Sequence, residues 1–233
     1  MLYLSPFITV YCSALAALFG VCMGSFLNCM AWRIVHGESV LKGRSHCDVC
    51  GHVLTVPELI PVFSYLRSKG KCRWCGAELS KGHLLAEIVS GLVFLTLLLK
   101  YDISLRLLEY SLFACVLLAC SFADLEGYII PDRFIIFGAA VRVVFVLLDE
   151  DIVPTAVDSA IGGVGIALVL LLVVLAVEKF MGREAMGGGD IKLIFVTGLY
   201  LGWKRNILCL ILACVLGVMM YAKYLNKAER GSK

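Results

Sequence analysis

Long runs of apolar residues, separated by short polar segments, are the main pattern of this chain. A membrane-spanning helix needs about 20 predominantly apolar residues, and the runs come close to that length. We therefore predict helices at residues 7–32, 84–100, 104–123, 134–148, 156–179, 191–203 and 206–224. The fourth run carries Arg142, and the sixth is short. The pattern predicts an all-α fold, a polytopic transmembrane helical bundle of about seven spans.

One long polar stretch interrupts the apolar pattern and predicts a small insert outside the membrane. We divide the chain into a first helix at 1–32, this insert at 33–82 and a membrane core at 83–233. The composition supports a lipid environment, because 61% of the residues are hydrophobic and 17% are charged, whereas a soluble domain is usually about half apolar. A net charge of +3 is too small to indicate a nucleic-acid partner.

Basic residues indicate which helix ends face the cytoplasm. No positive charge precedes the first apolar run, and the first basic residue, Arg33, follows it, which places the N-terminus outside. The segments 33–82, 124–133 and 180–190 then lie inside with the C-terminal tail, and they hold most of the 21 basic residues. The acidic loop 149–154 lies outside. The bias predicts a multi-pass protein of the cytoplasmic membrane, with the insert on the cytoplasmic side.

Two aspartates lie where apolar runs meet the predicted inner boundary. Asp124 directly follows the third run, and Asp190 opens the sixth helix after three glycines. Carboxylates beside lipid are costly and are usually functional or paired, so we predict that these two are catalytic. For Glu126 and Asp132, taken singly, we favour the interpretation of a polar turn at Pro131, which prevents an uninterrupted helix.

The sequence MGGGDIKL at 186–193 allows the backbone to approach closely and to adopt unusual dihedral angles, since glycine lacks a Cβ. Taken alone, it is typical of a flexible turn. A phosphate-binding loop is disfavoured, because an aspartate stands where such a loop has lysine followed by serine or threonine. We assign site-shaping roles to five residues around the two aspartates, namely Glu126, Asp132, Gly187, Gly189 and Lys192.

The pair of aspartates predicts a chemistry that neither predicts alone. Two carboxylates that share a site cannot both ionise cheaply, so the pair holds one proton between them. One carboxylate then takes a proton from a water molecule, and the other donates a proton to the carbonyl oxygen of the peptide bond that is cut. This hydrolysis needs neither a metal nor a covalent intermediate.

The eleven cysteines fall into two groups. Seven lie inside apolar runs, where a thiol behaves as a small hydrophobe. The other four form two Cys-x-x-Cys pairs in the insert, each followed by glycine, and predict a tetrahedral structural zinc site with the ligands Cys47, Cys50, Cys72 and Cys75. Redox-active or simply reduced pairs are the alternative. Because four thiolates fill such a site, we interpret the nearby histidines as ordinary surface residues: His46, His52 and His83.

Four motifs, in chain order, resemble those of the type IV prepilin peptidases, membrane aspartyl proteases with a Gly-x-Gly-Asp signature. They are GSFLN at 24–28, the paired cysteine knuckles, DLEGYIIPD at 124–132 and GGGDIK at 187–192. The resemblance covers nearly the whole chain and puts Asp124 and Asp190 in the catalytic places. The chain departs from the family pattern at GHLLAE, where Glu87 matches without the usual preceding proline.

The resemblance implies that the protein cuts the basic leader from prepilins or pseudopilins, just after a glycine, at the cytoplasmic face of the bacterial inner membrane. Many members also methylate the new N-terminal amine with S-adenosylmethionine, and the knuckle-bearing insert is associated with that bifunctional form. The expected partners are a prepilin or pseudopilin substrate and membrane lipid, without nucleic acid. No glycine fingerprint in the sequence itself predicts a site for S-adenosylmethionine.

Two other classes of function stay open at this stage. An ion- or proton-coupled transporter would also carry intramembrane charges and glycine-broken helices, and Arg142 fits that class best. A non-enzymatic membrane scaffold would use the zinc knuckles to recruit partners, but it leaves both aspartate motifs unexplained.

Overall fold

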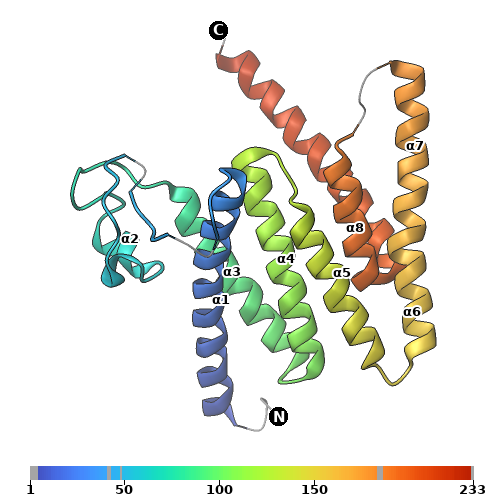
Figure 1. The fold of residues 1–233 in the computed structure, drawn as a ribbon, viewed down its shortest axis with the longest axis horizontal. Helices are drawn as coiled ribbons and strands as arrows, with labels where there is room; N and C mark the ends of the chain where they lie inside the picture. The colour runs from blue at the N-terminus through green and yellow to red at the C-terminus, as the bar shows by residue number, and fades with distance from the viewer. Residues whose placement is uncertain (1–4, 41–42, 48, 183–185, 232–233) are drawn as a thin grey trace. The chain divides into compact units, whose positions relative to one another are not determined.

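The computed structural model describes residues 5–40, 43–47, 49–182 and 186–231, and the side chains of these up to residue 223. The described residues form helices, turns and two isolated β-bridges, without a strand (Figure 1). This confirms the predicted all-α class. The chain divides into two compact units, Met1–Val141 and Arg142–Lys233, and each is described by itself.

Three long helices form the body of the first unit: α1 (Pro6–Val35), α3 (Lys81–Tyr101) and α4 (Leu105–Gly127), each in contact with the other two. Small residues let α1 and α3 approach closely. A Cβ on Gly24 would lie 2.5 Å from the Ser90 Oγ, and one on Gly20 would lie 2.7 Å from the Phe94 Cβ. Small residues four apart are a common device of helix packing in membranes. The contact fixes the two helices that flank the insert.

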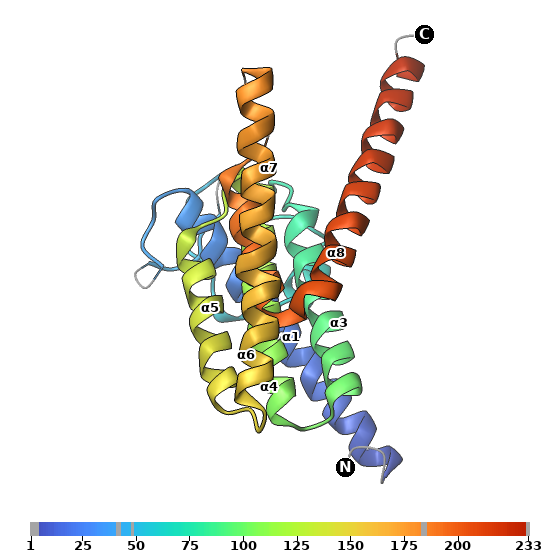
Figure 2. The same ribbon diagram turned by 90° about the vertical axis from the view of Figure 1, so that its right-hand side faces the viewer.

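The insert between α1 and α3 contains only short elements, the 3₁₀-helix η2 (Val56–Glu58) and α2 (Phe63–Arg67). Two antiparallel bridges, His46–Val53 and Lys71–Glu78, close one small loop each. Figures 1 and 2 show α2 beside the upper part of α1 rather than beyond its end.

The helix α5 (Asp132–Leu147) follows α4 after a short turn. In the second unit, α6 (Ile152–Ala160), the π-helical turn η3 (Ile161–Gly165) and α7 (Ile166–Met181) run on without a break. The last helix is α8 (Gly188–Gly231), which is interrupted at Gly202, whose φ of 70° and ψ of 172° are not helical.

A buried polar cluster stabilises the interruption in α8. The Asn206 side chain is 1% exposed and donates from Nδ2 to the Gly162 and Ile194 carbonyl oxygens, at 3.1 Å each. Its Oδ1 accepts a hydrogen bond from the Thr197 hydroxyl at 3.0 Å. Gly162 and Gly198 approach so closely that a side chain on either would meet the other's backbone. The interruption is therefore a packed feature of the unit.

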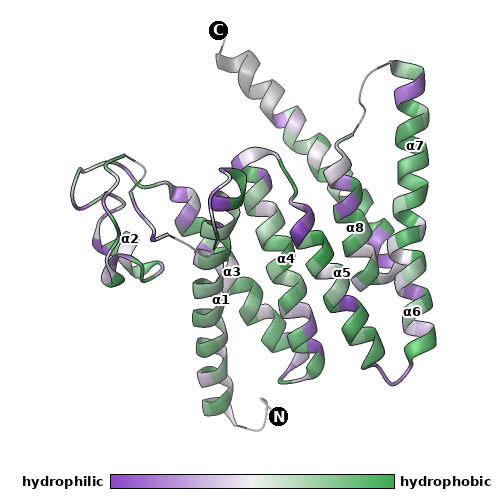
Figure 3. Ribbon diagram, viewed as in Figure 1, coloured by the Kyte–Doolittle hydropathy of each residue, from purple (hydrophilic) through white to green (hydrophobic). Residues whose placement is uncertain are grey.

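Five helical stretches in the described residues are long and apolar enough to cross a membrane: Pro6–Val35, Lys81–Tyr101, Leu105–Gly127, Ile152–Met181 and Gly188–Lys223. Figure 3 shows these stretches as predominantly hydrophobic. The predicted fourth span corresponds to α5, whose 16 residues are short for a span. The predicted sixth and seventh spans both lie in α8, on either side of Gly202. Lys204 and Arg205, which lie between the two predicted helices, follow the interruption directly.

Candidate active site and metal centre

Asp124 lies in the last turn of α4, which ends at Gly127. The predicted third helix stopped at residue 123, but α4 continues to Gly127 and ends with Tyr128 in the left-handed region, at φ 53° and ψ 35°. The Tyr128 N–H donates to the Asp124 carbonyl oxygen at 2.8 Å. The Asp124 side chain is exposed. It is thus carried on regular backbone at the very end of an apolar helix.

The end of α4 is held against the end of α1. A Cβ on Gly127 would lie 2.5 Å from the Val35 Cγ1. Glu126 is exposed, and its Oε1 lies 4.0 Å from the His36 Nε2, while the His36 ring stacks on Trp32. These contacts fix the backbone that carries Asp124. Asp132, the third acidic residue of this region, is the first residue of α5.

Asp190 lies in the first turn of α8, as the sequence predicts. Its N–H donates to the Gly187 carbonyl oxygen at 3.1 Å, and a Cβ on Gly187 would lie 3.6 Å from its Oδ2. None of the three glycines, 187, 188 and 189, has a positive φ. The segment therefore brings the carboxylate close to the backbone without left-handed geometry. Lys192 is exposed two residues further along the same helix.

Asp124 and Asp190 belong to different units, and the structure describes the surroundings of each separately. What the two sites share is their setting. Each carboxylate is exposed and lies within one turn of a helix end, next to a long apolar stretch. Their pairing, and the site-shaping roles of Glu126, Asp132, Gly187, Gly189 and Lys192, stay predictions.

Arg142, which fitted a transporter, contacts residues of its own unit that explain its place in an apolar helix. Its Nε donates to the Leu199 carbonyl oxygen at 2.9 Å, and its Nη2 donates to the buried Ser159 Oγ at 2.9 Å. The guanidinium also lies 5.6 Å from the centre of the Tyr200 ring. Because α8 is interrupted at Gly202, the carbonyl groups just before it lose their helical partners. Arg142 supplies one of those missing partners.

The four cysteines of the insert come together as the sequence predicts. One ligand atom from each of Cys47, Cys50, Cys72 and Cys75 lies within 4.8 Å of all the others, so the cluster could hold a metal ion. Cys47 and Cys72 are buried, and Cys50 and Cys75 are exposed. All eleven cysteines of the chain are free.

The two knuckles have matching backbone geometry. The Cys47 N–H donates to the His52 carbonyl oxygen at 2.9 Å, and the Cys72 N–H donates to that of Ala77 at 2.8 Å. The glycine after each pair, Gly51 or Gly76, has a φ of 69° or 74°, a left-handed conformation that only glycine adopts without strain. These glycines therefore turn the backbone after each pair.

The four thiols are close enough for the pKa of one to depend on its neighbours. Hydrogen bonds from the backbone N–H groups of Cys75 and Trp74 lower the pKa of the Cys72 thiol to about 7. A backbone hydrogen bond from Ala77 acts in the same direction on Cys75, but burial and the neighbouring thiols outweigh it and raise its pKa to about 11. A divalent cation removes this competition, because it stabilises every coordinated thiolate.

A cavity of about 380 Å³ lies between the insert, α1 and α3. No local sequence pattern predicts this cavity, since its lining comes from three separated segments. Two polar contacts connect these segments: the Glu87 Oε2 accepts from the Val62 N–H at 2.7 Å, and the Asn28 Nδ2 lies 2.5 Å from the His83 Nδ1. Glu87 is buried, and Trp32 and Tyr65 supply aromatic surface to the cavity. His83, interpreted above as an ordinary surface residue, is exposed and also lines this cavity.

Two family models match this chain. Residues 18–101 match the model of the bacterial peptidase A24 N-terminal domain, and residues 111–222 match that of the type IV leader peptidase family. The first match contains the knuckles, and the second contains both aspartates. No solved structure matches the chain significantly.

Curated relatives carry the name prepilin leader peptidase/N-methyltransferase. The chain is 33% identical over 207 residues to that of Bacillus subtilis (strain 168), covering 87% of this chain and 79% of the relative. It is 32% identical over 239 residues to that of Dichelobacter nodosus, covering 88% and 80%. For that of Myxococcus xanthus (strain DK1622), the values are 30% over 222 residues, 94% and 61%.

The helices, the aspartate motifs and the cysteine cluster thus define a polytopic membrane protein of the A24 peptidase type. The chain belongs to the type IV leader peptidase family. It spans less than two thirds of some relatives, with 61% of the Myxococcus xanthus protein and 62% of the Aeromonas salmonicida protein. The comparisons do not support the transporter alternative.

Proposed function

We propose that the chain is an aspartic endopeptidase of the bacterial inner membrane, which cuts the basic leader of prepilins or pseudopilins after a glycine. The observation that carries the proposal is the placement of Asp124 in the last turn of one apolar helix and Asp190 in the first turn of another, within the matched peptidase segment. Residues 83–233 form the protease core in this proposal, and the insert at 33–82 is cytoplasmic.

The proposed site requires Asp124 and Asp190 to face the same side of the membrane. Between Asp124 and Asp190 the chain forms α5 and then the continuous helix from α6 to α7. The two aspartates therefore reach the same side of the membrane only when α5 crosses it as well. At about 1.5 Å per residue the 16 residues of α5 span about 24 Å, somewhat less than the roughly 30 Å hydrocarbon core. The acidic loop after α5, at 149–151, suits the outer face. A short helix that crosses at a locally thinned bilayer satisfies the requirement.

The proposed mechanism uses one water molecule and the two carboxylates. With one proton held between them, the ionised carboxylate accepts a proton from water, while the protonated one donates to the scissile carbonyl oxygen. The substrate is suited to this position, because a basic leader stays in the cytoplasm while an apolar pilin helix lies in the bilayer. Gly187 and Gly189 leave room for an extended peptide beside Asp190, and Glu126, Asp132 and Lys192 set the local charge.

The insert would hold one Zn²⁺ through its four cysteines. Zinc suits the site because it favours four thiolate ligands in a tetrahedron. Its role is structural, since the four cysteines leave no open coordination position for a substrate. Proton competition would release the metal on acidification.

Methylation of the new N-terminus is a second proposed activity, and the cavity beside the insert supports it. Its volume of about 380 Å³ lies in the range of small-molecule sites. S-adenosylmethionine carries a sulfonium cation, which the buried Glu87 and the aromatic faces of Trp32 and Tyr65 would stabilise. When bound, it supplies the methyl group. The Glu87 carboxylate and the rings would hold the positive centre.

One assay tests both activities. The purified chain is incubated with a synthetic leader peptide and S-adenosylmethionine, and mass spectrometry follows the products. We expect a cut after the glycine of the leader and an added methyl group on the new N-terminus. A Tyr65→Ala variant should lose the methyl group and keep the cut. An intact peptide would contradict the proposed peptidase.

A further inference from the structure

The insert exposes a short apolar segment, of which the cavity accounts for only a part: Leu59, Ser64 and Tyr65 line the cavity, while Ile60, Phe63 and Leu66 do not. We call residues 59–66, LIPVFSYL, the apolar segment. Its four large apolar side chains are exposed by about half: Leu59 45%, Ile60 45%, Phe63 54% and Leu66 64%. They follow one another too closely to be the scattered exposed residues that every surface carries. They lie close together in sequence, in an insert between two helices that are long and apolar enough to cross a membrane.

The backbone of this segment is held to α3 at a defined level. The Val62 N–H donates to the Glu87 Oε2 at 2.7 Å. Glu87 comes six residues after the start of α3 at Lys81, which corresponds to about 9 Å along the helix axis. The segment is therefore tied to α3 within the helix, more than one turn from its N-terminal end.

A second contact, with α1, also places the apolar segment beside the body of a helix rather than beyond its end. A groove of about 380 Å³ is lined both by Leu59 and Pro61 of the segment and by Cys22 and Phe26 of α1. Phe26 lies nine residues before the end of α1 at Val35, about 14 Å along the axis. Since α1 has 30 residues and a length of about 45 Å, it exceeds the hydrocarbon core by about 15 Å. With that excess at the C-terminal end of α1, where Arg33 lies, this level falls at the boundary between acyl chains and headgroups.

The turn that presents the segment is strained and held in place. Val62 has a φ of 60° and a ψ of −51°, and the Phe63 N–H donates to the Pro61 carbonyl oxygen at 2.5 Å. This is a γ-turn with positive φ, a rare conformation that is especially unfavourable for a β-branched residue. Strain of this kind persists only where surrounding contacts enforce it. Here, the hydrogen bond to the Glu87 carboxylate holds the turn, and Phe63, the next residue, is exposed.

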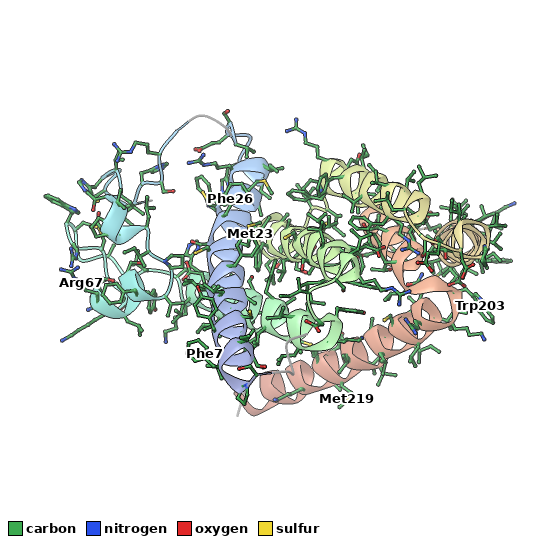
Figure 4. The ribbon with its side chains drawn as sticks, turned by 90° about the horizontal axis from the view of Figure 1, so that it is seen from below. Phe7, Met23, Phe26, Arg67, Trp203 and Met219 are labelled. Atoms are coloured by element: carbon green, nitrogen blue, oxygen red, sulfur yellow. The ribbon has the colours of Figure 1, made fainter. Side chains whose placement is uncertain are left out.

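Basic side chains follow the apolar segment at once. They are Arg67, Lys69, Lys71 and Arg73, and all four are exposed. Figure 4 shows Arg67 on the insert, on the side away from α1. Apolar residues beside several cations are the pattern of an element that lies in the interface of an anionic membrane.

We propose that the apolar segment is an interfacial membrane anchor. Leu59, Ile60, Phe63 and Leu66 enter the headgroup–acyl boundary of the bilayer that α1 and α3 cross, and the four cations that follow bind anionic lipid headgroups. The anchor holds the insert flat against the membrane beside α1. It requires that α1 and α3 cross the membrane but does not depend on the peptidase activity.

Photocrosslinking of the full chain tests the anchor. A benzophenone amino acid replaces Phe63, and the protein is placed in nanodiscs of phosphatidylcholine with or without phosphatidylglycerol. Val49, 73% exposed on the first knuckle, is the negative control, and Leu92, 59% exposed in the middle of α3, is the positive control. Irradiation and mass spectrometry then identify what is attached.

We expect lipid adducts at position 63 in a yield near that at position 92 and several-fold above that at position 49. Phosphatidylglycerol should raise the yield at 63, and the double variant Arg67→Gln, Lys69→Gln should remove that increase. A crosslink from 63 to a second copy of the chain would overturn the proposal, as would a yield no higher than at 49. Leader cleavage is measured in parallel, so a failed anchor and a failed peptidase are distinguishable.

Discussion

The Glu87 carboxylate accepts a hydrogen bond from the Val62 backbone N–H at 2.7 Å, across 25 residues of chain. Glu87 is 8% exposed, so removing its side chain leaves a polar backbone group without its partner. The contact joins the strained turn of the insert to α3 and closes one side of the cavity.

Replacing Glu87 with alanine should therefore loosen the insert. The expected loss is about 1–3 kcal/mol for a part-buried donor left without its partner, seen as faster amide hydrogen exchange at Val62 and Phe63. Glu87→Gln is the matched control, because its side-chain carbonyl oxygen can still accept the bond. Equal exchange in Glu87→Ala and in the parent chain would show that the contact does not hold the turn.

The close approach of α1 and α3 gives a second prediction. Gly24→Leu places a side chain where the Ser90 Oγ lies 2.5 Å from the Cβ position, so the helices must separate. Overpacking of this kind typically costs about 1–3 kcal/mol, and thermal unfolding in detergent should show the loss. Gly217→Leu is the control, since nothing lies within 4 Å of its Cβ position. If both variants unfold at the same temperature, the close packing is not needed.

The metal centre gives a third prediction. Metal analysis of the purified chain should find one zinc ion per chain, and Cys50→Ser should lose it. Cys22→Ser is the control, because Cys22 is an exposed free cysteine on α1. Zinc should also dissociate as the pH falls, because protons compete for the thiolates. A parent chain without zinc, or a Cys50→Ser variant that keeps it, would contradict the assignment.

The sequence predicted those features of the structure that depend on residues close together in the chain. The knuckles and their glycines lie within six-residue segments, so the spacing alone was enough to predict them. The helix ends at Asp124 and Asp190 follow from where the apolar runs stop, and the error of a few residues at α4 arises because a helix can continue through polar residues at its solvent end.

The features that the sequence did not show depend on distant partners. The bond from Val62 to Glu87 joins segments whose pairing no local pattern specifies, and the cavity follows from it. The interruption at Gly202 is stabilised by Asn206 and Arg142 through partners on other helices. Arg142 was therefore ambiguous in the sequence, while in the structure it pairs with a carbonyl group at a helix end.

The position of α5 gives a fourth prediction, on which the shared face of the two aspartates depends. A reporter enzyme that is active only outside the cytoplasm, fused after Glu150, should be active. The same reporter fused within the insert, after Gly76, should be inactive and serves as the control. An inactive fusion after Glu150 would leave α5 on the cytoplasmic side and put Asp124 and Asp190 on opposite faces.

The most direct test of the central claim is cleavage of a leader peptide by Asp124→Asn and Asp190→Asn. Each change keeps the side-chain volume but removes the shared proton, so each variant should lose essentially all cleavage while inserting and unfolding like the parent chain. Glu126→Gln, two residues from Asp124, should keep measurable cleavage and controls for the loss of a nearby charge. Normal cleavage by either asparagine variant would contradict the two-aspartate mechanism.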